Sequence, residues 1–356
     1  MTRVVHVASG REWRGGQRQV WLLARELARS GDVEQIVVTG AGSELDARLV
    51  RAGIRVRPVP WSAGLDPRVL PGLLAELRPA GTLLHAHDAH AARIAWLAAG
   101  LLRQKLVITR RVELPLRRLG ALARADRVIA ISRAVADVLM AGGVPGERIT
   151  VVHSGIPLDE VRRTPRLGVR ERLGLAADTP IAASVGALTP EKDHASLIRA
   201  AARLAGRIPS LHWVVAGEGR ERPRLEQLSR SLGLERRIHL LGHLDDPARL
   251  VADADVFVSS SLQEGLGTSV LEALALGTPV ASTGTGGPRE MLQNGAGVLT
   301  QPGDPDALAD AVARLLTQAE LRRSVVERGA EAVEHFTVAR MADGVRSVYR
   351  TCVPFP

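Results

Sequence analysis

The sequence is poor in several residue types, and each shortage excludes a class of protein. Among 356 residues there is a single cysteine, Cys352, so the chain can form neither an internal disulfide nor a zinc site made of several thiolates. Aromatic residues make up only 3% of the chain, and they do not alternate with basic residues as they do in surfaces that stack on bases. We therefore expect a reducing compartment and no nucleic-acid partner.

Long apolar runs are also missing. The longest uncharged apolar run, residues 94–102, has about half of the roughly 20 residues that are needed to span a bilayer. The amino-terminal residues lack the apolar stretch and the small-residue cleavage site of a secretory signal. These absences predict a cytoplasmic protein without a transmembrane helix.

Lysine is nearly absent, whereas arginine is abundant and unevenly distributed. Lys105 and Lys192 are the only lysines, and residues 1–165 carry a net charge of +10 while the rest of the chain carries −1. Genomic base composition can explain a preference for arginine over lysine, but it does not explain this asymmetry. A basic first half is typical of proteins that bind an anionic partner.

One segment concentrates this charge. Residues 103–127 carry a net charge of +6, and Leu114, Leu116 and Leu119 lie among their arginines. Basic and apolar side chains in one segment favour peripheral contact with an anionic membrane, here at the inner face of the cell membrane. The alternative is a solvated surface that is merely rich in arginine.

Short β-branched runs alternate with longer amphipathic segments along the chain, which is the pattern of parallel sheets covered by helices. The runs expected to form strands are residues 4–8, 35–39, 54–59, 82–87, 106–109, 127–131, 149–153, 181–185, 212–216, 238–241, 256–259, 279–282 and 297–300. A stretch with proline and arginine at residues 155–180 separates them into two sets. We therefore expect an α/β fold with two doubly wound domains, whose ligands bind beyond the carboxyl ends of the strands.

The loop after the expected strand 181–185 contains one of the two lysines. Thr189 is a suitable N-cap and Pro190 suits the first helical position, so Lys192 is expected in the first turn of a helix. A cation there opposes the helix dipole, unless an anion binds beside it. The sequence therefore predicts an anion at Lys192; the alternative is a solvated lysine on an exposed turn.

A second loop combines two glutamates with a glycine-rich turn. Glu264 lies in the turn, a helix is expected to begin near Gly267, and Glu272 falls within an apolar part of that helix. Free N–H groups at the helix start can receive a phosphate. A buried carboxylate needs donors, which a ribose diol or a neighbouring arginine would supply.

A third loop, residues 10–19, joins the first strand to the first helix and contains Gly15 and Gly16. Glycines at a helix start let a ligand approach the backbone, although a plain turn fits equally well. A weaker turn of this kind is Gly217-Glu218-Gly219. The spacing G-x-G-x-x-G is absent from these loops, which disfavours a nicotinamide oxidoreductase.

Together these loops resemble glycosyltransferase family 4, over nearly the whole chain from Val4 to Tyr349. The matching stretches are residues 15–16, 128–132, 151–156, 185–186 with Lys192, 217–219, 264–272 with 277–280, and 286–290. The resemblance implies the GT-B fold, in which two Rossmann-like, doubly wound parallel-sheet domains face each other across a cleft. It further implies an acceptor-binding domain over residues 1–160, a nucleotide-sugar-binding domain over residues 161–335 and a helix in residues 336–356 that returns to the first domain.

The resemblance also implies a retaining transfer of a sugar from a nucleoside-diphosphate sugar, without a metal or another cofactor. The implied acceptor is an anionic or lipid-linked glycan of the cell envelope. Glu272 would hold the ribose, Lys192 the diphosphate and Glu264 the sugar hydroxyls. The donor-binding residues implied are Gly15, Gly16, Arg18, Gly186, Lys192, Glu218, Leu241, Gly265, Leu266, Gly267, Thr268 and Glu272; the catalytic ones are Lys192, Glu264, Arg110 and Arg111; those on the acceptor side are His87, Asp88, His90 and Arg110.

One departure from the family pattern bears on catalysis. Members usually carry an arginine directly after Gly186, where this chain has Ala187. Positive charge for the departing diphosphate must then come from elsewhere, and Arg18, Arg110 and Arg111 are the candidates. Two alternatives remain open: a GT-B-shaped nucleotide-sugar epimerase, and a catalytically weak subunit that binds nucleotide sugar, for which Ala187 is the best argument.

Two clusters imitate metal sites. Asp253 and Asp255 have the Asp-x-Asp spacing, but they precede a strand, where structural roles explain both acids. Residues 85–90 include three histidines and Asp88, a spacing compatible with a metal, although we favour polar lining of an acceptor site. We therefore predict no metal.

Overall fold

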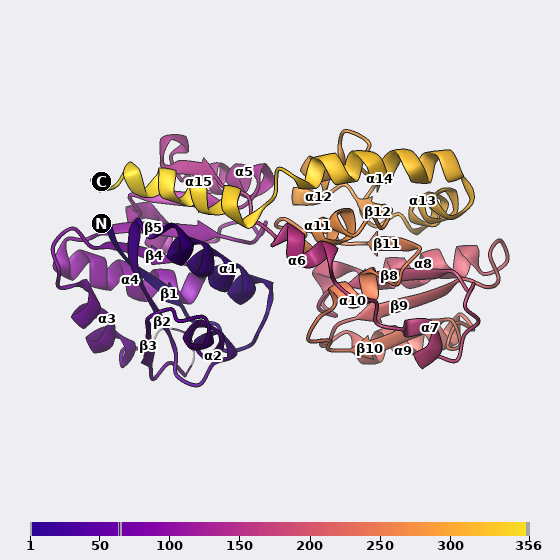
Figure 1. The fold of residues 1–356 in the computed structure, drawn as a ribbon, viewed down its shortest axis with the longest axis horizontal. Helices are drawn as coiled ribbons and strands as arrows, with labels where there is room; N and C mark the ends of the chain where they lie inside the picture. Colours follow the sequence, from indigo (N-terminus) through magenta and orange to yellow (C-terminus); the bar gives the residue numbers. More distant parts are fainter. Residues whose placement is uncertain (1, 63, 65, 354–356) are drawn as a thin grey trace. The chain divides into compact units, whose positions relative to one another are not determined.

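Two parallel sheets flanked by helices make up the fold in the computed structural model, which describes residues 2–62, 64 and 66–353 (Figure 1). Within these residues the first sheet has seven strands in the order β3-β2-β1-β4-β5-β6-β7. Its strands are β1 (Thr2–Ala8), β2 (Val33–Gly40), β3 (Val56–Val59), β4 (Leu83–Ala86), β5 (Lys105–Arg110), β6 (Arg127–Ala130) and β7 (Ile149–Val151). Its helices are α1 (Gly15–Ser30), α2 (Glu44–Arg51), α3 (Val69–Leu77), α4 (Ala89–Leu102), α5 (Arg133–Ala141) and α15 (Val338–Arg350), with 3-10 turns η1 (Gly120–Arg124) and η2 (Gly146–Arg148).

The second sheet, again counted over the described residues, has six strands in the order β10-β9-β8-β11-β12-β13. Its strands are β8 (Ile181–Val185), β9 (His212–Ala216), β10 (Ile238–Gly242), β11 (Val256–Ser259), β12 (Val280–Thr283) and β13 (Val298–Thr300). Its helices are α6 (Leu158–Arg162), α7 (Val169–Arg172), α8 (His194–Leu204), α9 (Arg222–Ser231), α10 (Ala248–Val251), α11 (Thr268–Ala275), α12 (Gly286–Leu292), α13 (Pro305–Thr317) and α14 (Ala319–Val333), with the 3-10 turn η3 (Pro190–Lys192).

The chain divides into two compact units. The first comprises the described residues up to Gly155 and from Thr337 onward, and the second comprises Ile156–Phe336. The predicted boundary at residue 160 therefore falls inside α6, whose Leu158 and Val161 are buried. The cause is local, because the Ile156 N–H donates to the Phe336 carbonyl and so ties the chain to the second unit from this point on.

Helix α15 comes from the far end of the chain, yet it belongs to the first unit, where it packs beside α1 (Figure 1). Helix α1 buries an apolar stripe that includes Val20, Leu23 and Leu27, and it ends at Gly31 in the left-handed conformation with φ of 68°. Tyr349 of α15 is completely buried in the same core. The carboxyl-terminal segment is thus part of the first unit's core.

Each sheet has a point at which its strand order reverses. In the first unit this point lies between β1 and β4, and in the second between β8 and β11. The strands that meet at these points are parallel, and in sheets of this kind the loops after the two strands diverge and ligands bind beyond the carboxyl ends. The sites that the topology favours are therefore the loops after β1 and β4 and the loops after β8 and β11.

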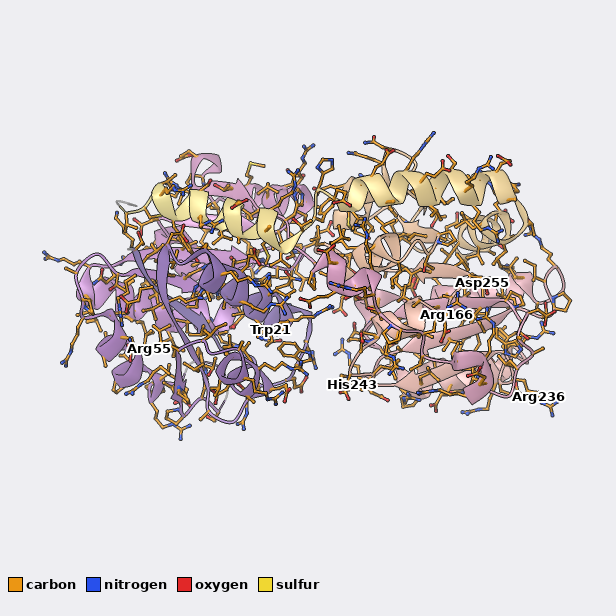
Figure 2. The ribbon with its side chains drawn as sticks, in the orientation of Figure 1. Trp21, Arg55, Arg166, Arg236, His243 and Asp255 are labelled. Atoms are coloured by element: carbon orange, nitrogen blue, oxygen red, sulfur yellow. The ribbon has the colours of Figure 1, made fainter. Side chains whose placement is uncertain are left out.

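Charged side chains cover the outside of both units, as the exposed Arg55 and Arg236 illustrate (Figure 2). No helix in the described part of the chain is both long and apolar enough to cross a membrane.

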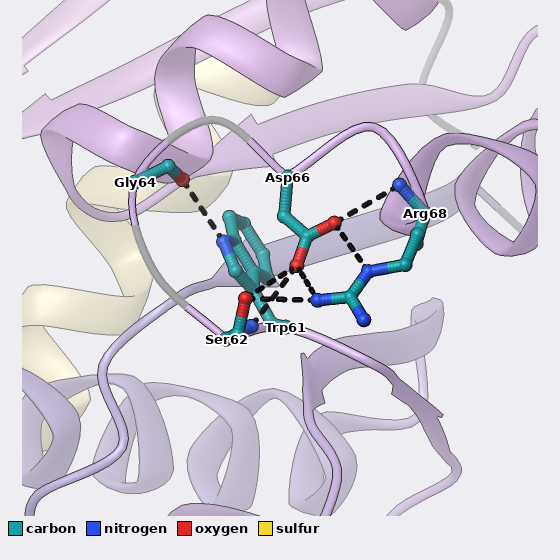
Figure 3. A network of polar contacts seen from close by, with 5 residues as sticks. All are labelled: Trp61, Ser62, Gly64, Asp66 and Arg68. Carbon is teal, nitrogen blue, oxygen red and sulfur yellow. Dashed lines mark hydrogen bonds and ion pairs between the residues drawn. The ribbon is translucent and has the colours of Figure 1, made fainter.

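Asp66, between β3 and α3, accepts hydrogen bonds from Ser62 and from the backbone and guanidinium of Arg68 (Figure 3). These bonds keep the pKa of Asp66 well below its usual range.

Candidate active site

The reversal point of the second sheet brings together two residues that the sequence singled out. Lys192, in the segment after β8, forms an ion pair with Glu264, which follows β11. Both side chains are largely buried, with 26% and 14% of their surfaces exposed. The Ser261 hydroxyl also donates to Glu264, at 3.3 Å, and the Ser260 hydroxyl donates to the carbonyl of Lys192, at 2.9 Å. The two loops are therefore one connected site.

Lys192 does not lie in the first turn of an α-helix, as the sequence predicted. It ends the 3-10 turn η3, which Thr189 and Pro190 begin as expected. Helix α8 starts afterwards, at His194, and its N-cap is Asp193, whose side chain accepts from the Ser196 N–H. Asp193 adopts φ of 44°, a left-handed conformation that aspartate tolerates better than most residues. The left-handed residue Asp193 thus separates Lys192 in η3 from helix α8.

His194 lies beneath the loop that carries Ala187, and its role was not apparent from the sequence. Its side chain is 4% exposed and its ring lies against the backbone of Gly186 and Ala187. Burial, followed by the nearby charge of Lys192, lowers the pKa of His194 to about 4. The ring is therefore neutral at pH 7 and cannot supply the positive charge that an arginine at position 187 would carry.

Glycines fix the loops of this site against one another. A Cβ on Gly217 would lie 1.8 Å from the carbonyl oxygen of Gly186, and one on Gly219 would lie 2.3 Å from that of Leu188. Only hydrogen atoms fit into such gaps. The Gly217 N–H donates to the carbonyl of Gly242, so the loops after β8, β9 and β10 are joined in a row.

Helix α11 opens beside Glu264. Gly267 adopts φ of 83° directly before Thr268, and the helix has neither a side-chain cap nor an acidic residue in its first turn. The first N–H groups of such a helix have no partner within the helix and can bind an anion, so the phosphate contacts expected of Gly265, Leu266, Gly267 and Thr268 stay a prediction. Glu272 is 2% exposed in the middle of this helix. The expected burial of this carboxylate is confirmed.

Three further residues expected at the donor, Glu218, Leu241 and Gly186, differ in exposure and in their contacts. Glu218 has 52% of its side chain exposed and forms an ion pair with Arg222 at 2.9 Å, which lowers the pKa of its carboxyl group. Leu241 is half-buried in β10. Gly186 lies against Lys192, because a Cβ there would be 3.5 Å from Cδ of the lysine.

In the first unit, Gly15 and Gly16 form the start of α1. The side chain of the N-cap, Arg14, does not cap the helix, and the first turn has no acidic residue. A Cβ on Gly16 would lie 3.8 Å from Cδ of Arg111, so the arginine side chain passes directly beside the helix start. Arg18 is half-buried one turn further along α1.

Arg110 and Arg111 diverge at the end of β5, because successive residues of a strand point to opposite sides. Arg110 donates to the carbonyls of Val112 at 3.2 Å and of Leu114 at 2.7 Å, so it supports the loop that follows. Arg111 points inward, where burial lowers its pKa to about 10. Only Arg111 brings its charge to the reversal point of the sheet.

Of the residues expected to line an acceptor site, only His90 is exposed. His87 is 3% exposed, with Nε2 hydrogen bonded to Nδ1 of His6 at 2.9 Å. Its ring therefore lies in the core, and its assignment to the acceptor side stays a prediction. Asp88 is the N-cap of α4 and also accepts from the N–H and hydroxyl of Ser9, which ties β4 to β1.

Protein groups bind the two candidate carboxylates and most of the candidate histidine nitrogens. Asp253 accepts from the N–H of Val169, and Asp255 accepts from the N–H of Ile181 and from Arg170, so both carboxylates have the structural roles that their position suggested. The nitrogens of His6, His85 and His87 lie within 4.8 Å of one another in the core. The guanidinium of Arg111 lies 3.4 Å from this group, and such a charge opposes binding of a second cation.

The basic segment 103–127 does not form one face. Lys105 pairs with Asp126 at 2.8 Å at the amino end of β5, whereas Arg110 and Arg111 are at its carboxyl end. Between β5 and η1, however, a short stretch exposes both basic and apolar side chains. Its exposed members are Val112, Leu114, Pro115, Arg117 and Arg118.

Comparisons with known proteins identify a family for both units of the chain. The model of the family described as Glycosyltransferase Family 4 matches residues 13–160, and that described as Glycosyl transferases group 1 matches residues 168–332. A D-inositol 3-phosphate glycosyltransferase of Mycolicibacterium paratuberculosis is 31% identical over 95% of this chain and 86% of that protein. The lipopolysaccharide core biosynthesis glycosyltransferase LpsE of Rhizobium meliloti is 36% identical, over 46% of this chain and 47% of that protein. The chain thus spans about half the length of some curated relatives and most of others.

Solved structures share the fold at low identity. The Anabaena protein Alr3699/HepE, in complex with UDP-glucose, matches with a TM-score of 0.87 and 21% identity over 98% of this chain and 99% of that one. A glycosyltransferase from Rickettsia africae matches with a TM-score of 0.85 and 19% identity over 98% of both chains. The expected GT-B fold is confirmed.

Proposed function

This chain belongs to glycosyltransferase family 4, and from that premise we propose that it transfers a sugar from a nucleoside-diphosphate sugar to a cell-envelope glycan, with retention and without a metal. The observation that carries the proposal is the joined site of Lys192, Glu264 and the start of α11. It offers one cation, one carboxylate and free helical N–H groups at the reversal point of a doubly wound sheet. A sugar diphosphate requires these three kinds of group.

The roles within this site follow from chemistry. The ammonium of Lys192 neutralises charge on the departing diphosphate, and the N–H groups at the start of α11 bind its oxygens. Glu264 accepts hydrogen bonds from sugar hydroxyls, while Glu272 holds the ribose. The UDP-glucose in the Anabaena structure supports a nucleotide sugar as the donor.

The acceptor is proposed to be anionic. The first 165 residues carry a net charge of +10, and anionic ligands are attracted by such a field. The names of two relatives, a D-inositol 3-phosphate glycosyltransferase and a lipopolysaccharide core glycosyltransferase, support an acceptor with phosphate or of the cell envelope. We propose that the start of α1 and Arg111 bind a phosphate group of the substrates.

The test is a thermal-shift screen of the purified protein with UDP, GDP, ADP and their sugars, followed by turnover with and without EDTA. A nucleotide that binds the native state raises the melting temperature by mass action. We expect one base to be preferred and turnover to survive EDTA. An altered nucleotide sugar as product would indicate an epimerase, and binding without turnover would favour the weak binding subunit that Ala187 suggests.

Glu272→Gln is expected to weaken binding of the preferred nucleoside diphosphate by about 1–3 kcal/mol, the scale of a lost hydrogen bond to a charged group. The change keeps the volume of the side chain and removes only its charge. Isothermal titration measures the affinity. Glu226→Gln, which changes an exposed carboxylate paired with Arg222 in the same unit, is the control. Unchanged affinity in folded Glu272→Gln would remove the ribose assignment.

The exposed stretch after β5 is proposed to touch an anionic membrane at the inner face of the cell, where a lipid-linked acceptor resides. Each basic side chain near such a surface contributes about 1 kcal/mol. Arg117→Glu/Arg118→Glu should abolish co-sedimentation with vesicles containing phosphatidylglycerol at low salt. Arg224→Glu/Arg236→Glu, an equal change of charge on exposed residues of the second unit, should not. Binding to neutral phosphatidylcholine vesicles that ignores salt and both variants would contradict the proposal.

A further inference from the structure

Three histidines form a polar cluster in the core of the first unit that the proposed function does not use. His6 of β1 and His85 of β4 are opposite each other in the parallel register, and His87 follows on the same side of β4. Their exposed fractions are 0%, 0% and 3%. His85 bonds to the Tyr349 hydroxyl and to Thr109, both at 2.7 Å. Burying these polar groups in an apolar core costs desolvation free energy, which hydrogen bonds to partners at both ends of the cluster must offset.

Arg111 lies at the end of the histidine cluster opposite Tyr349. Its Nη2 lies 3.4 Å from Nδ1 of His87, and its Nη1 lies 3.4 Å from the Ser154 hydroxyl. Among the described residues no carboxylate pairs with Arg111, and its Nε is buried without a hydrogen-bond partner. Asp88 is near enough to favour the charge of the guanidinium, but its oxygens bind Ser9 and the start of α4.

The contacts determine where the protons are. Arginine can only donate, so Nδ1 of His87 must accept, and the single proton of a neutral imidazole is then on Nε2. Nε2 donates to Nδ1 of His6 at 2.9 Å, which places the His6 proton on its own Nε2, an atom buried without a partner. Burial lowers the pKa of both rings, that of His6 to about 3, so the neutral forms are present at pH 7.

From this arrangement we infer that His87, with its proton directed by His6, is a positioning residue that holds the Arg111 guanidinium beside the start of α1 for a phosphate group of the substrate. The inference rests on the proposed function. The helix start and the guanidinium are both positive, and a phosphate between them would satisfy both. Arg111 is thus a buried cation of the first unit, in a chain whose second unit has Ala187 in place of the family's usual arginine. A neutral histidine suits this task, because it orients the guanidinium without neutralising it.

Two amide substitutions separate this role from simple packing. The amide of His87→Asn falls near Nδ1 and can still accept from Arg111, whereas the amide of His87→Gln falls near Nε2 and keeps only the contact with His6. We expect His87→Gln to lower kcat at least about tenfold and His87→Asn to remain within about threefold of the wild type. In an Arg111→Met background, itself expected to lose about a hundredfold, His87→Gln should cause no further loss.

The chain offers a matched control in its second unit. Nδ1 of His212 and Nε2 of His239 are also 2.9 Å apart, in stacked rings, at the amino ends of β9 and β10. His239→Gln should leave kcat unchanged. Thermal unfolding of every variant shows whether the fold is retained. Equal losses of kcat in His87→Asn and His87→Gln, or an undiminished loss in the Arg111→Met background, would overturn the inference.

Binding measurements identify the source of the phosphate. Titration with UDP and with inorganic pyrophosphate reports on the donor, and the KM of the acceptor reports on an acceptor phosphate. Weaker pyrophosphate binding by His87→Gln than by His87→Asn supports the inference with a donor phosphate, and a raised acceptor KM alone supports it with an acceptor phosphate. If the wild type binds pyrophosphate but turns over no nucleotide sugar, the proposed function is contradicted. The comparison of pyrophosphate binding by His87→Gln and His87→Asn would then still test the role of His87.

Discussion

Lys192→Ala is expected to lower kcat about a hundredfold while changing the KM of the donor less than about threefold. The charge of Lys192 is most valuable when the diphosphate departs, because negative charge then develops on its oxygens. Its environment increases this dependence, since His194 is neutral and position 187 carries no charge. The ion pair with Glu264 also holds the lysine in place. Steady-state kinetics with the preferred nucleotide sugar measure both constants.

The other lysine provides the control. Lys105 is likewise paired with a carboxylate, that of Asp126, so Lys105→Ala removes a comparable ion pair at the amino end of β5. Its kcat should equal that of the wild type. Equal losses in kcat and in donor affinity for Lys192→Ala would instead assign Lys192 to binding of the ground state. Ala187→Arg extends the test, and a higher kcat would show that the missing arginine limits the reaction.

The sequence predicted the sheets well, because buried parallel strands are nearly continuous β-branched runs. Each of the thirteen strands in the described part of the chain overlaps a predicted run, and β8, β9 and β11 have the predicted bounds. Loop chemistry also carried information, as the start of η3 at Thr189 and Pro190 shows. These features depend on neighbours in the sequence, which a single chain reveals.

Features that depend on distant neighbours were not predictable. Nothing near His6 indicates that β4 will place His85 opposite it, or that Tyr349 will return from the far end of the chain to bond with His85. The ion pair of Lys192 with Glu264 depends on β8 and β11 being neighbours in the sheet. The sequence likewise suggested a place at an acceptor site for His87, whereas its ring packs against those of His6 and His85 in the core. Topology decided each case.

The glycines of the second unit lead to the other large expected effect. Gly217→Ala should lower the free energy of unfolding by about 3 kcal/mol, the upper end of the cost of overpacking, because the new Cβ meets the backbone oxygen of Gly186 at 1.8 Å and no side chain can move aside. For a unit of this size that corresponds to roughly 6–12 °C in melting temperature. The loop after β8 must shift to relieve the collision, and UDP affinity should fall at least about tenfold.

Gly233→Ala separates the collision from the backbone conformation. Gly233 also has a positive φ, 67°, but nothing lies within 4 Å of its Cβ position, so its substitution should cost only the strain of a left-handed residue, about 1–2 kcal/mol. Its UDP affinity should remain that of the wild type, since it follows α9 and contacts none of the site loops. If both variants lost equal stability and neither lost affinity, the contact of Gly217 with Gly186 would not hold the donor loop in place. The larger combined loss in Gly217→Ala is expected because this contact joins the loop of Lys192 to the loops after β9 and β10.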